Sequence, residues 1–373
     1  MSTPQTTAQA QQLAHAKQLV WRFLSAAPGA DASVACSTLL APDCQWHVGH
    51  PINLLSGAQA VHDEFFGPLQ VAFPDLERRA DIFFGSHFDG RFDGGAGWWV
   101  CTTGHYLGTF KADWLGIPAT GEPATLRFGE FYRVEGGRIV EARVLLDIID
   151  LARQAGVNLL PPSSGLDILV PGPRLHNGLL LAPGDEAETA QSIGLVEAMI
   201  GGLMRYDQAD LKSMGMGRYW RQDMMWYGPC GIGTARGISG FERHHQAPFL
   251  HAFPDRKGGT HRARLAEGPF VASTGWPSVR ATHLGAYLGA PACNMPIQMR
   301  DGLVALRKRV VGRKLGLHRP AALVIADGCG RAGAAACALM GLRRPAGVGS
   351  WAPLGGPDAS LPATPFTTFE MRC

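Results

Sequence analysis

The chain has 373 residues, of which 46% are hydrophobic and 17% charged, with 34 Lys and Arg residues against 31 Asp and Glu residues. These values are ordinary for a globular protein, and the length suggests two domains. No apolar run is long enough to cross a bilayer, and the N-terminus lacks the basic start and apolar core of a signal peptide. The eight cysteines form no Cys-x-x-Cys pair, which argues against a disulfide framework or a zinc site and predicts a cytoplasmic protein with reduced thiols.

The first part of the chain predicts helices followed by strands. Leu13, Ala16, Val20 and Leu24 fall near one face of a helix expected over residues 5–24. We expect shorter helices over residues 33–40 and 57–69, the second broken at Gly67-Pro68, and a strand over residues 44–48. Long antiparallel strands joined by Gly-rich turns are expected over residues 81–85, 98–107, 123–134 and 138–146. Helices before a run of strands indicate an α+β fold.

A Pro- and Gly-rich segment, residues 161–185, predicts a linker between a domain at 1–160 and a second domain at 186–300. Beyond it the same plan restarts, with a helix expected over residues 186–206 and strands over 271–276 and 280–288. Several residues recur at one constant offset: Trp46 as Trp226, Gly57 as Gly237, Pro68 as Pro248 and Phe73-Pro74-Asp75 as Phe253-Pro254-Asp255. Further on, His283-Leu284-Gly285 repeats the pattern of His105-Tyr106-Leu107-Gly108. Arg300 follows Pro291 at the same spacing at which Arg127 follows Pro118. The chain therefore predicts a tandem repeat.

The last part of the chain, residues 301–373, does not continue this plan. It carries 10 Lys and Arg residues against 4 Asp and Glu residues, and it shows little hydrophobic periodicity. When the sequence from Asp301 onward is back-translated and read one nucleotide later, the degenerate codons permit an amino-acid sequence that matches residues 129–158 of the first repeat. The free choice among codons inflates this match. We therefore expect a frameshift near Asp301, a second domain that lacks its last strands, and a disordered basic tail. The alternative is a genuine basic tail that binds a partner.

Polar residues that alternate along the expected strands predict one pocket. Arg143 and Asp147 share a face of one strand, Arg127 and Phe131 share a face of the next, and Trp99 and His105 share a face of a third. An Asp in an apolar pocket has a raised pKa and suits proton transfer, while Arg127 and His105 would stabilise an enolate oxygen. Asp147 can equally cap the following helix or pair with Arg127 or Arg143.

Other candidates carry less specific signals. Trp46 is a candidate substrate-binding residue, although packing explains a tryptophan equally well. Trp226, His283, Arg300 and Glu267 are the corresponding candidates for a pocket in the second domain, where Glu267 and His283 could also satisfy each other. No nucleotide-binding glycine fingerprint and no metal-binding motif is found, so we expect neither a cofactor nor a metal.

These residues resemble the SnoaL-like polyketide cyclases of the nuclear transport factor 2-like superfamily. The resemblance rests on Gly104-His105, on Leu115-Gly116-Ile117-Pro118-Ala119-Thr120-Gly121, on Phe131 to Glu141, on Asp147 and on Gln154-Ala155-Gly156. It implies two cone-shaped domains, each a curved antiparallel sheet packed on N-terminal helices, with Asp147 as the acid/base and His105 in the pocket. Arg143 stands where many members carry tryptophan.

The resemblance implies cofactor-independent acid/base chemistry, such as an intramolecular aldol cyclisation, on a small hydrophobic carbonyl or polyketide-like ligand. The alternative is a non-catalytic module that binds a small ligand or dimerises, because fold does not fix function. We expect no nucleic acid or membrane partner, and either a homo-oligomer or intramolecular pairing of the two repeats.

Overall fold

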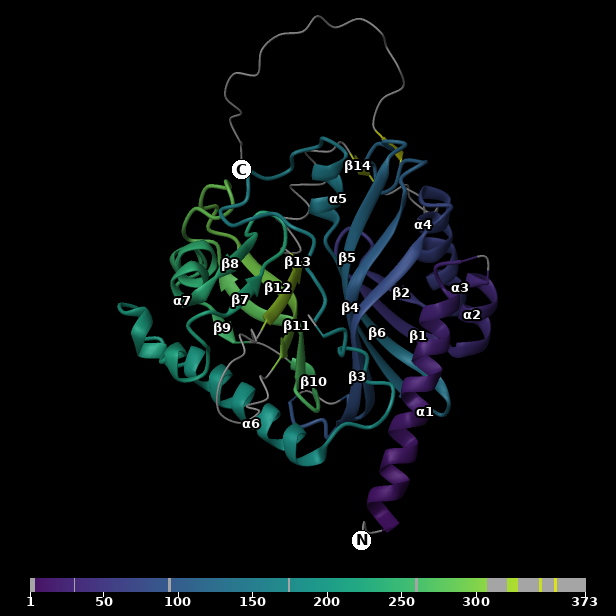
Figure 1. Cartoon of the computed structure of the whole chain (residues 1–373). Helices are drawn as coiled ribbons and strands as arrows, with labels where there is room; N and C mark the ends of the chain where they lie inside the picture. Colours follow the sequence, from purple (N-terminus) through teal and green to yellow (C-terminus); the bar gives the residue numbers. More distant parts are fainter. Residues whose placement is uncertain are drawn as a thin grey trace, which may run out of the picture.

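The computed structural model describes residues 4–29, 31–92, 95–173, 175–258, 261–306, 321–327, 342–343 and 352–353. Two sheets with helices packed on them form the molecule, which is α+β as expected (Figure 1). We call residues 4–159 the N-terminal half and residues 186–327 the C-terminal half.

The N-terminal half begins with helices and ends with long strands. Its helices are α1 (Pro4–Ala26), α2 (Ala32–Leu39), α3 (Ala58–Val61), η1 (His62–Phe66), α4 (Gly67–Ala72) and α5 (Ile148–Gln154). Its strands are β1 (Leu40–Val48), β2 (Leu54–Ser56), β3 (Glu77–Phe88), β4 (Gly97–Thr109), β5 (Pro123–Glu135) and β6 (Arg138–Leu146). They form one sheet in the order β2-β1-β6-β5-β4-β3, in which only β1 and β6 run parallel.

Local chemistry explains several of these boundaries. Gly136 and Gly137 both have positive φ, as the two-residue hairpin turn between β5 and β6 requires. Asp147 ends β6 and caps α5, because its side chain accepts a hydrogen bond from the Asp150 backbone N–H. The helix expected to break at Gly67-Pro68 continues instead to Ala72 through a π-helical turn, because Pro68 lies in the first turn of α4, where its missing N–H costs nothing.

The C-terminal half repeats the strand order of the first sheet. Its helices are α6 (Glu186–Leu203), η2 (Leu211–Met214), η3 (Met216–Arg218), α7 (Gly237–Phe241), η4 (Glu242–Gln246) and α8 (Ala247–Ala252). Its strands are β7 (Met225–Tyr227), β8 (Thr234–Arg236), β9 (Lys257–Gly258), β10 (His261–Glu267), β11 (Phe270–Thr282), β12 (Pro296–Leu306) and β13 (Ala321–Asp327). The sheet runs β10-β11-β12-β13-β7-β8, with β7 and β13 parallel. The strands expected over residues 271–276 and 280–288 are one strand, β11, which ends at Thr282, so the strand expected over residues 283–288 is not present.

Two segments beyond residue 300 differ from the expectation. β12 continues to Leu306, and β13 pairs with it antiparallel, with Arg300 opposite Asp327. The prediction that the strands end at Arg300 is therefore wrong for these segments, because they complete the sheet between β11 and β7. Residues 342–343 and 352–353 form a further short strand pair, β14 and β15. The remaining tail lies outside the described residues, and the frameshift stays a prediction.

Backbone hydrogen bonds correct one detail of the sequence comparison between the two halves. In the N-terminal half, the Phe110 N–H bonds to Glu122 and the next N–H, of Lys111, bonds to Ala72. In the C-terminal half, the His283 N–H bonds to Met295 and the next N–H bonds to Ala252. His283 thus occupies the position of Phe110, and the sequence match of His283 with His105 is wrong.

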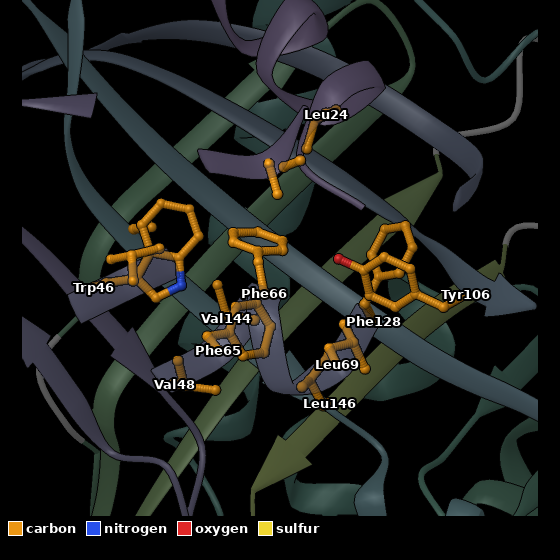
Figure 2. Close-up of a cluster of buried hydrophobic side chains, with 14 of the residues drawn as sticks. Leu24, Trp46, Val48, Phe65, Phe66, Leu69, Tyr106, Phe128, Val144 and Leu146 are labelled. Atoms are coloured by element: carbon orange, nitrogen blue, oxygen red, sulfur yellow. The ribbon is translucent and has the colours of Figure 1, made fainter. Parts of the chain in front are cut away.

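Each face of the first sheet is buried, but against a different partner. On one face, rings and aliphatic side chains pack beneath the helices; Figure 2 shows Trp46, Phe66, Tyr106 and Phe128 converging there with Leu24 of α1. On the other face, side chains of the first sheet pack against side chains of the second sheet. The members of this second cluster, which we call the inter-sheet cluster, include Phe84, Phe88, Trp99, Phe131, Leu145, Tyr227, Leu265 and Phe270.

Candidate functional site

Arg127 and Asp147 form a buried ion pair on the face that meets the second sheet. Arg127 Nη2 donates to Asp147 Oδ2, and Arg127 Nη1 donates to the carbonyl oxygen of Gly228 at 3.1 Å. Asp147 also accepts from the Cys230 N–H at 3.0 Å and from the Asp150 N–H at 3.3 Å. The Asp147 carboxylate therefore has its hydrogen bonds satisfied by fixed donors from both halves of the chain.

His105 lies on the same sheet face but has a different partner. It is opposite Arg127 in the β4–β5 register, as alternation predicted. Its Nδ1 lies 3.8 Å from Asp81 Oδ2 on β3 and makes no hydrogen bond with a described group. The structure thus brings Arg127 and Asp147 together and places His105 beside Asp81 instead.

Arg143 and Arg300, one from each half, flank the same indole ring. The Arg143 guanidinium carbon lies 5.4 Å from the centre of the Trp276 ring, and that of Arg300 lies 5.1 Å from it. Arg143 Nη2 donates to Glu141 Oε1 at 2.6 Å, and Glu141 also accepts from Arg262 at 3.0 Å. Burial alone would raise the pKa of Glu141, but the hydrogen bonds from Arg262 and the charge of Arg143 outweigh it and lower that pKa to about 2. Glu141, through its ion pair with Arg262, and Arg143, through the Trp276 ring, therefore join the two halves.

The other predicted residues of the first pocket separate onto two faces. Trp99 and Phe131 belong to the inter-sheet cluster. Trp46 lies on the opposite face, among Phe23, Phe66 and Tyr132, and its indole N–H has no partner among the described groups. These residues therefore do not line one pocket with Asp147.

A polar network that the sequence reasoning missed lies beneath the helices of the N-terminal half. Glu130 Oε2 accepts from Arg78 Nη1 at 2.6 Å and from the Tyr132 hydroxyl at 2.6 Å, and its Oε1 accepts from the Tyr106 hydroxyl at 3.2 Å. Arg78 also donates to the Tyr106 hydroxyl oxygen. Glu130, Tyr106 and Tyr132 are each at most 1% exposed. The available signal was the alternation along β5, which places Glu130 and Tyr132 on the face opposite Arg127 and Phe131.

The electrostatics of this network keep its phenols protonated. Burial raises the pKa of Tyr106 and of Tyr132 well above the usual range, so both hydroxyls remain hydrogen-bond donors. Burial opposes the charge of Arg78, but the Glu130 carboxylate outweighs it and raises the pKa of Arg78. Arg78 also lines a cleft of about 510 Å³, with Trp21, Leu24 and Ser25 of α1 on its other wall. The network thus combines a carboxylate, two phenols and a guanidinium next to a cleft.

In the C-terminal half, the predicted residues are also distributed over separate places. Glu267 contacts Lys17 of α1, as described below, and does not contact His283. His283 Nδ1 lies 3.3 Å from Cys293 Sγ and its ring packs on Phe253. Trp226 stacks on His245, with ring centres 5.0 Å apart.

Polar atoms in the interior of the C-terminal half lack partners. His245 and Gln246, which the sequence reasoning missed, occupy the positions of Phe65 and Phe66 at the offset of Trp46 and Trp226. The His245 Nδ1, the Gln246 Oε1 and the Trp226 N–H have no hydrogen-bond partner among the described groups. Burial lowers the pKa of His245 to about 4. The two interiors therefore differ in polarity at equivalent positions.

The described residues contain no group of three or more His, Cys, Asp or Glu side chains arranged to hold a metal ion. Within the same part of the chain, no helix has the length and apolar character needed to cross a membrane.

Comparison with known proteins supports the family resemblance for the N-terminal half. Residues 18–155 match the family model of the SnoaL-like polyketide cyclases. A search of curated proteins gave no match.

Solved structures similar to this chain include three bacterial proteins. AclR of Streptomyces galilaeus, described as a candidate hydroxylase, is 20% identical over 39% of this chain and 97% of its own, with a TM-score of 0.32. IdmH of Streptomyces antibioticus, a candidate polyketide cyclase, is 22% identical over 35% of this chain and 91% of its own, with a TM-score of 0.29. A candidate polyketide cyclase of Xanthomonas campestris is 17% identical over 39% of this chain and 98% of its own, with a TM-score of 0.32.

Proposed function

We propose that this protein is a cytoplasmic SnoaL-like enzyme that carries out cofactor-independent acid/base chemistry on a small hydrophobic carbonyl compound. We also propose that its two halves are tandem repeats of one domain, paired within the chain. The family match over residues 18–155 supports the first proposal, and the equal strand order of the two sheets supports the second.

The network around Glu130 is the reaction centre that we propose. The carboxylate takes a proton from the carbon next to a substrate carbonyl, and the C–H electron pair becomes that of the enolate. Arg78 and the Tyr106 hydroxyl stabilise the enolate oxygen by charge and hydrogen bonding. The enolate carbon then attacks a second carbonyl of the same molecule, whose oxygen takes back the proton from Glu130, so that an aldol product forms without an added reactant. The single observation that carries this assignment is the carboxylate–phenol–guanidinium network whose arginine lines a cleft.

Asp147 is the second candidate for the acid/base. Its position matches the family motif, but its carboxylate is paired with Arg127 and bonded to the Cys230 N–H. Catalysis by either carboxylate requires that its donors release it, because Glu130 is bonded by Arg78, Tyr106 and Tyr132; the two differ in that Arg78 lines a cleft. The two assignments give different results in one experiment.

The experiment measures deuterium uptake at the α-carbon of an aromatic β-keto ester in D₂O by NMR. We expect Glu130→Gln to reduce the enzyme-dependent uptake at least about 100-fold, in line with the usual contribution of general acid/base catalysis. Glu135→Gln is the matched control, because Glu135 lies on the same strand, is exposed and, among the described residues, pairs with Arg133 alone. Uptake that survives in Glu130→Gln and disappears in Asp147→Asn would move the reaction centre to Asp147.

A non-catalytic, ligand-binding module remains the second candidate function. The observation that favours it is the dense packing of rings beneath the helices of the N-terminal half, where Trp46 contacts both Phe66 and Tyr132; Figure 2 shows Trp46 and Phe66 in this cluster. If wild-type protein binds the keto ester in a tryptophan fluorescence titration but exchanges no proton in any form, this second function is supported and the enzymatic one is not.

A further inference from the structure

A second concave site lies on the C-terminal half, and its lining contains none of the residues of the two centres described above. It has a volume of about 470 Å³, within the usual size range of small-molecule sites. Three segments form its walls: linker residues 164–166, strand β8, and the helical turn from Ser239 to His244. The sequence assigned this linker only a connecting role.

Backbone hydrogen bonds fix the linker wall on the edge strand of the second sheet. The Leu166 N–H donates to the Thr234 carbonyl oxygen at 2.9 Å, and the Thr234 N–H donates back to Leu166 at 2.8 Å. The Ser164 hydroxyl lies within hydrogen-bonding distance of the carbonyl oxygens of Ile232 and His244, at 3.2 Å each. Gly165 allows this close approach, since a Cβ there would lie 2.6 Å from the Thr234 oxygen. The walls of the site are therefore held together before any ligand binds.

The charged groups of this site have one sign. Its lining contains Arg236, Arg243 and His244 and no Asp or Glu. Among the described residues, neither guanidinium has an ion pair or a hydrogen bond. Other arginines of the molecule, such as Arg127 and Arg143, are paired with carboxylates. Two unpaired guanidinium groups in one concavity are suited to a planar or tetrahedral anion, which each can bind with two parallel hydrogen bonds.

The rim of the site adds an apolar contact. Leu166 is 63% exposed although the backbone that carries it is fixed on β8. An ordered, exposed leucine beside two cations is a surface for a ligand that has both an apolar and an anionic part.

We propose that this site binds a small anionic molecule, whose phosphate or carboxylate group lies between Arg236 and Arg243 and whose apolar part lies on Leu166. The proposal rests on this site alone and holds whether or not the reaction proposed above occurs.

Calorimetric titration of the full chain tests this proposal with four probes: inorganic phosphate, 1-naphthyl phosphate, 1-naphthoate and neutral 1-naphthol. We expect binding of one or both naphthyl anions, weaker binding of phosphate and none of naphthol at the same site. The comparison of naphthyl phosphate with naphthoate distinguishes a phosphate ligand from a carboxylate ligand. Each of Arg236→Gln and Arg243→Gln should weaken binding about 10-fold, and the double variant should abolish it.

Two further variants separate this site from general surface charge. Arg280→Gln is the matched control, because Arg280 is an exposed arginine on β11 outside the site, and it should leave the affinity unchanged. Ser239→Phe fills the concavity while keeping both arginines, and it should abolish binding with an unchanged circular dichroism spectrum. Binding that persists in the double arginine variant, an equal loss in Arg280→Gln, or no binding of any anion at millimolar concentration would each overturn the proposal.

Discussion

A buried ion pair between Lys17 and Glu267 joins the first helix to the second sheet. Lys17 Nζ lies 2.6 Å from Glu267 Oε1, and their side chains are 1% and 4% exposed. Lys17 Nζ also donates to the Ala182 carbonyl oxygen at 3.0 Å. Glu267 accepts from the N–H groups of Gly85 at 2.8 Å and Gly184 at 3.0 Å. The pair thus connects both halves and the end of the linker at one point.

Replacing one residue of the Lys17–Glu267 pair should lower the free energy of unfolding more than replacing both. In Glu267→Met, the Lys17 ammonium stays buried without its counter-charge, and two backbone N–H groups lose their acceptor. Removal of one member of a buried pair costs about 3–5 kcal/mol, and each unsatisfied N–H adds about 1–3 kcal/mol. In Lys17→Met/Glu267→Met, the buried charge is gone, and what is lost is the acceptor of the two N–H groups and the Lys17 donor of the Ala182 carbonyl oxygen. We therefore expect the double variant to be more stable than Glu267→Met by about 2 kcal/mol or more.

Urea unfolding followed by circular dichroism measures these differences as a double-mutant cycle with Lys17→Met as the fourth corner. The midpoint should fall most in Glu267→Met and recover in part in the double variant. The control Glu77→Met removes an exposed carboxylate that pairs with Arg79 and should change the unfolding free energy by less than about 1 kcal/mol. Losses that simply add, with a coupling energy below about 0.5 kcal/mol, would refute the reasoning.

Two other predictions follow from burial and backbone contact. The pKa of His245 is about 4 in the folded chain against about 6.5 unfolded, so the stability that neutral His245 contributes is present above pH 6.5 and is lost as the pH falls toward 4. When the free energy of unfolding is measured from pH 7.5 to 4.5, His245→Phe should reduce its decrease by up to about 3 kcal/mol, and an unchanged pH slope would contradict this. Gly104→Ala places a Cβ 1.9 Å from the Arg79 carbonyl oxygen and should destabilise the fold by about 3 kcal/mol or more. The control Gly194→Ala lies in open space on helix α6 and should raise the thermal midpoint slightly. A Gly104→Ala variant as stable as the wild type would contradict the close approach of β3 and β4.

Strand alternation predicted which residues share a face but not what that face meets. Arg127 and Phe131 do lie on one face with Arg143 and Asp147, because side chains alternate along a strand whatever surrounds it. The face that packs beneath the helices is the other one, where Glu130 and Tyr132 lie. The sequence could not decide between them because both faces of this sheet are covered, so that both carry apolar residues.

One partner of Asp147 was hidden from sequence reasoning for a different reason. This contact comes from the backbone N–H of Cys230, and backbone groups of a distant loop leave no signal in residue type, whereas the cap on the Asp150 N–H was named in advance. The third, Arg127, was named in advance as a possible partner. The alternatives stated for Asp147, a helix cap and an ion pair, are both present, while its catalytic role stays a proposal.

The inter-sheet cluster determines where a substrate can approach. Phe84 of the first sheet stacks on Phe270 of the second, with ring centres 5.8 Å apart, and Phe131 contacts the Gly302 position of β12. Asp147 and its partner Arg127 are bonded to residues of the C-terminal half, which the Lys17–Glu267 pair also joins to the first. Arg78, which bonds Glu130, lines a cleft whose other wall is formed by α1 side chains. Because Arg78 of the Glu130 network already lines a cleft, whereas Asp147 is bonded across the two halves, chemistry at Glu130 is the assignment that leaves the pairing of the two halves intact.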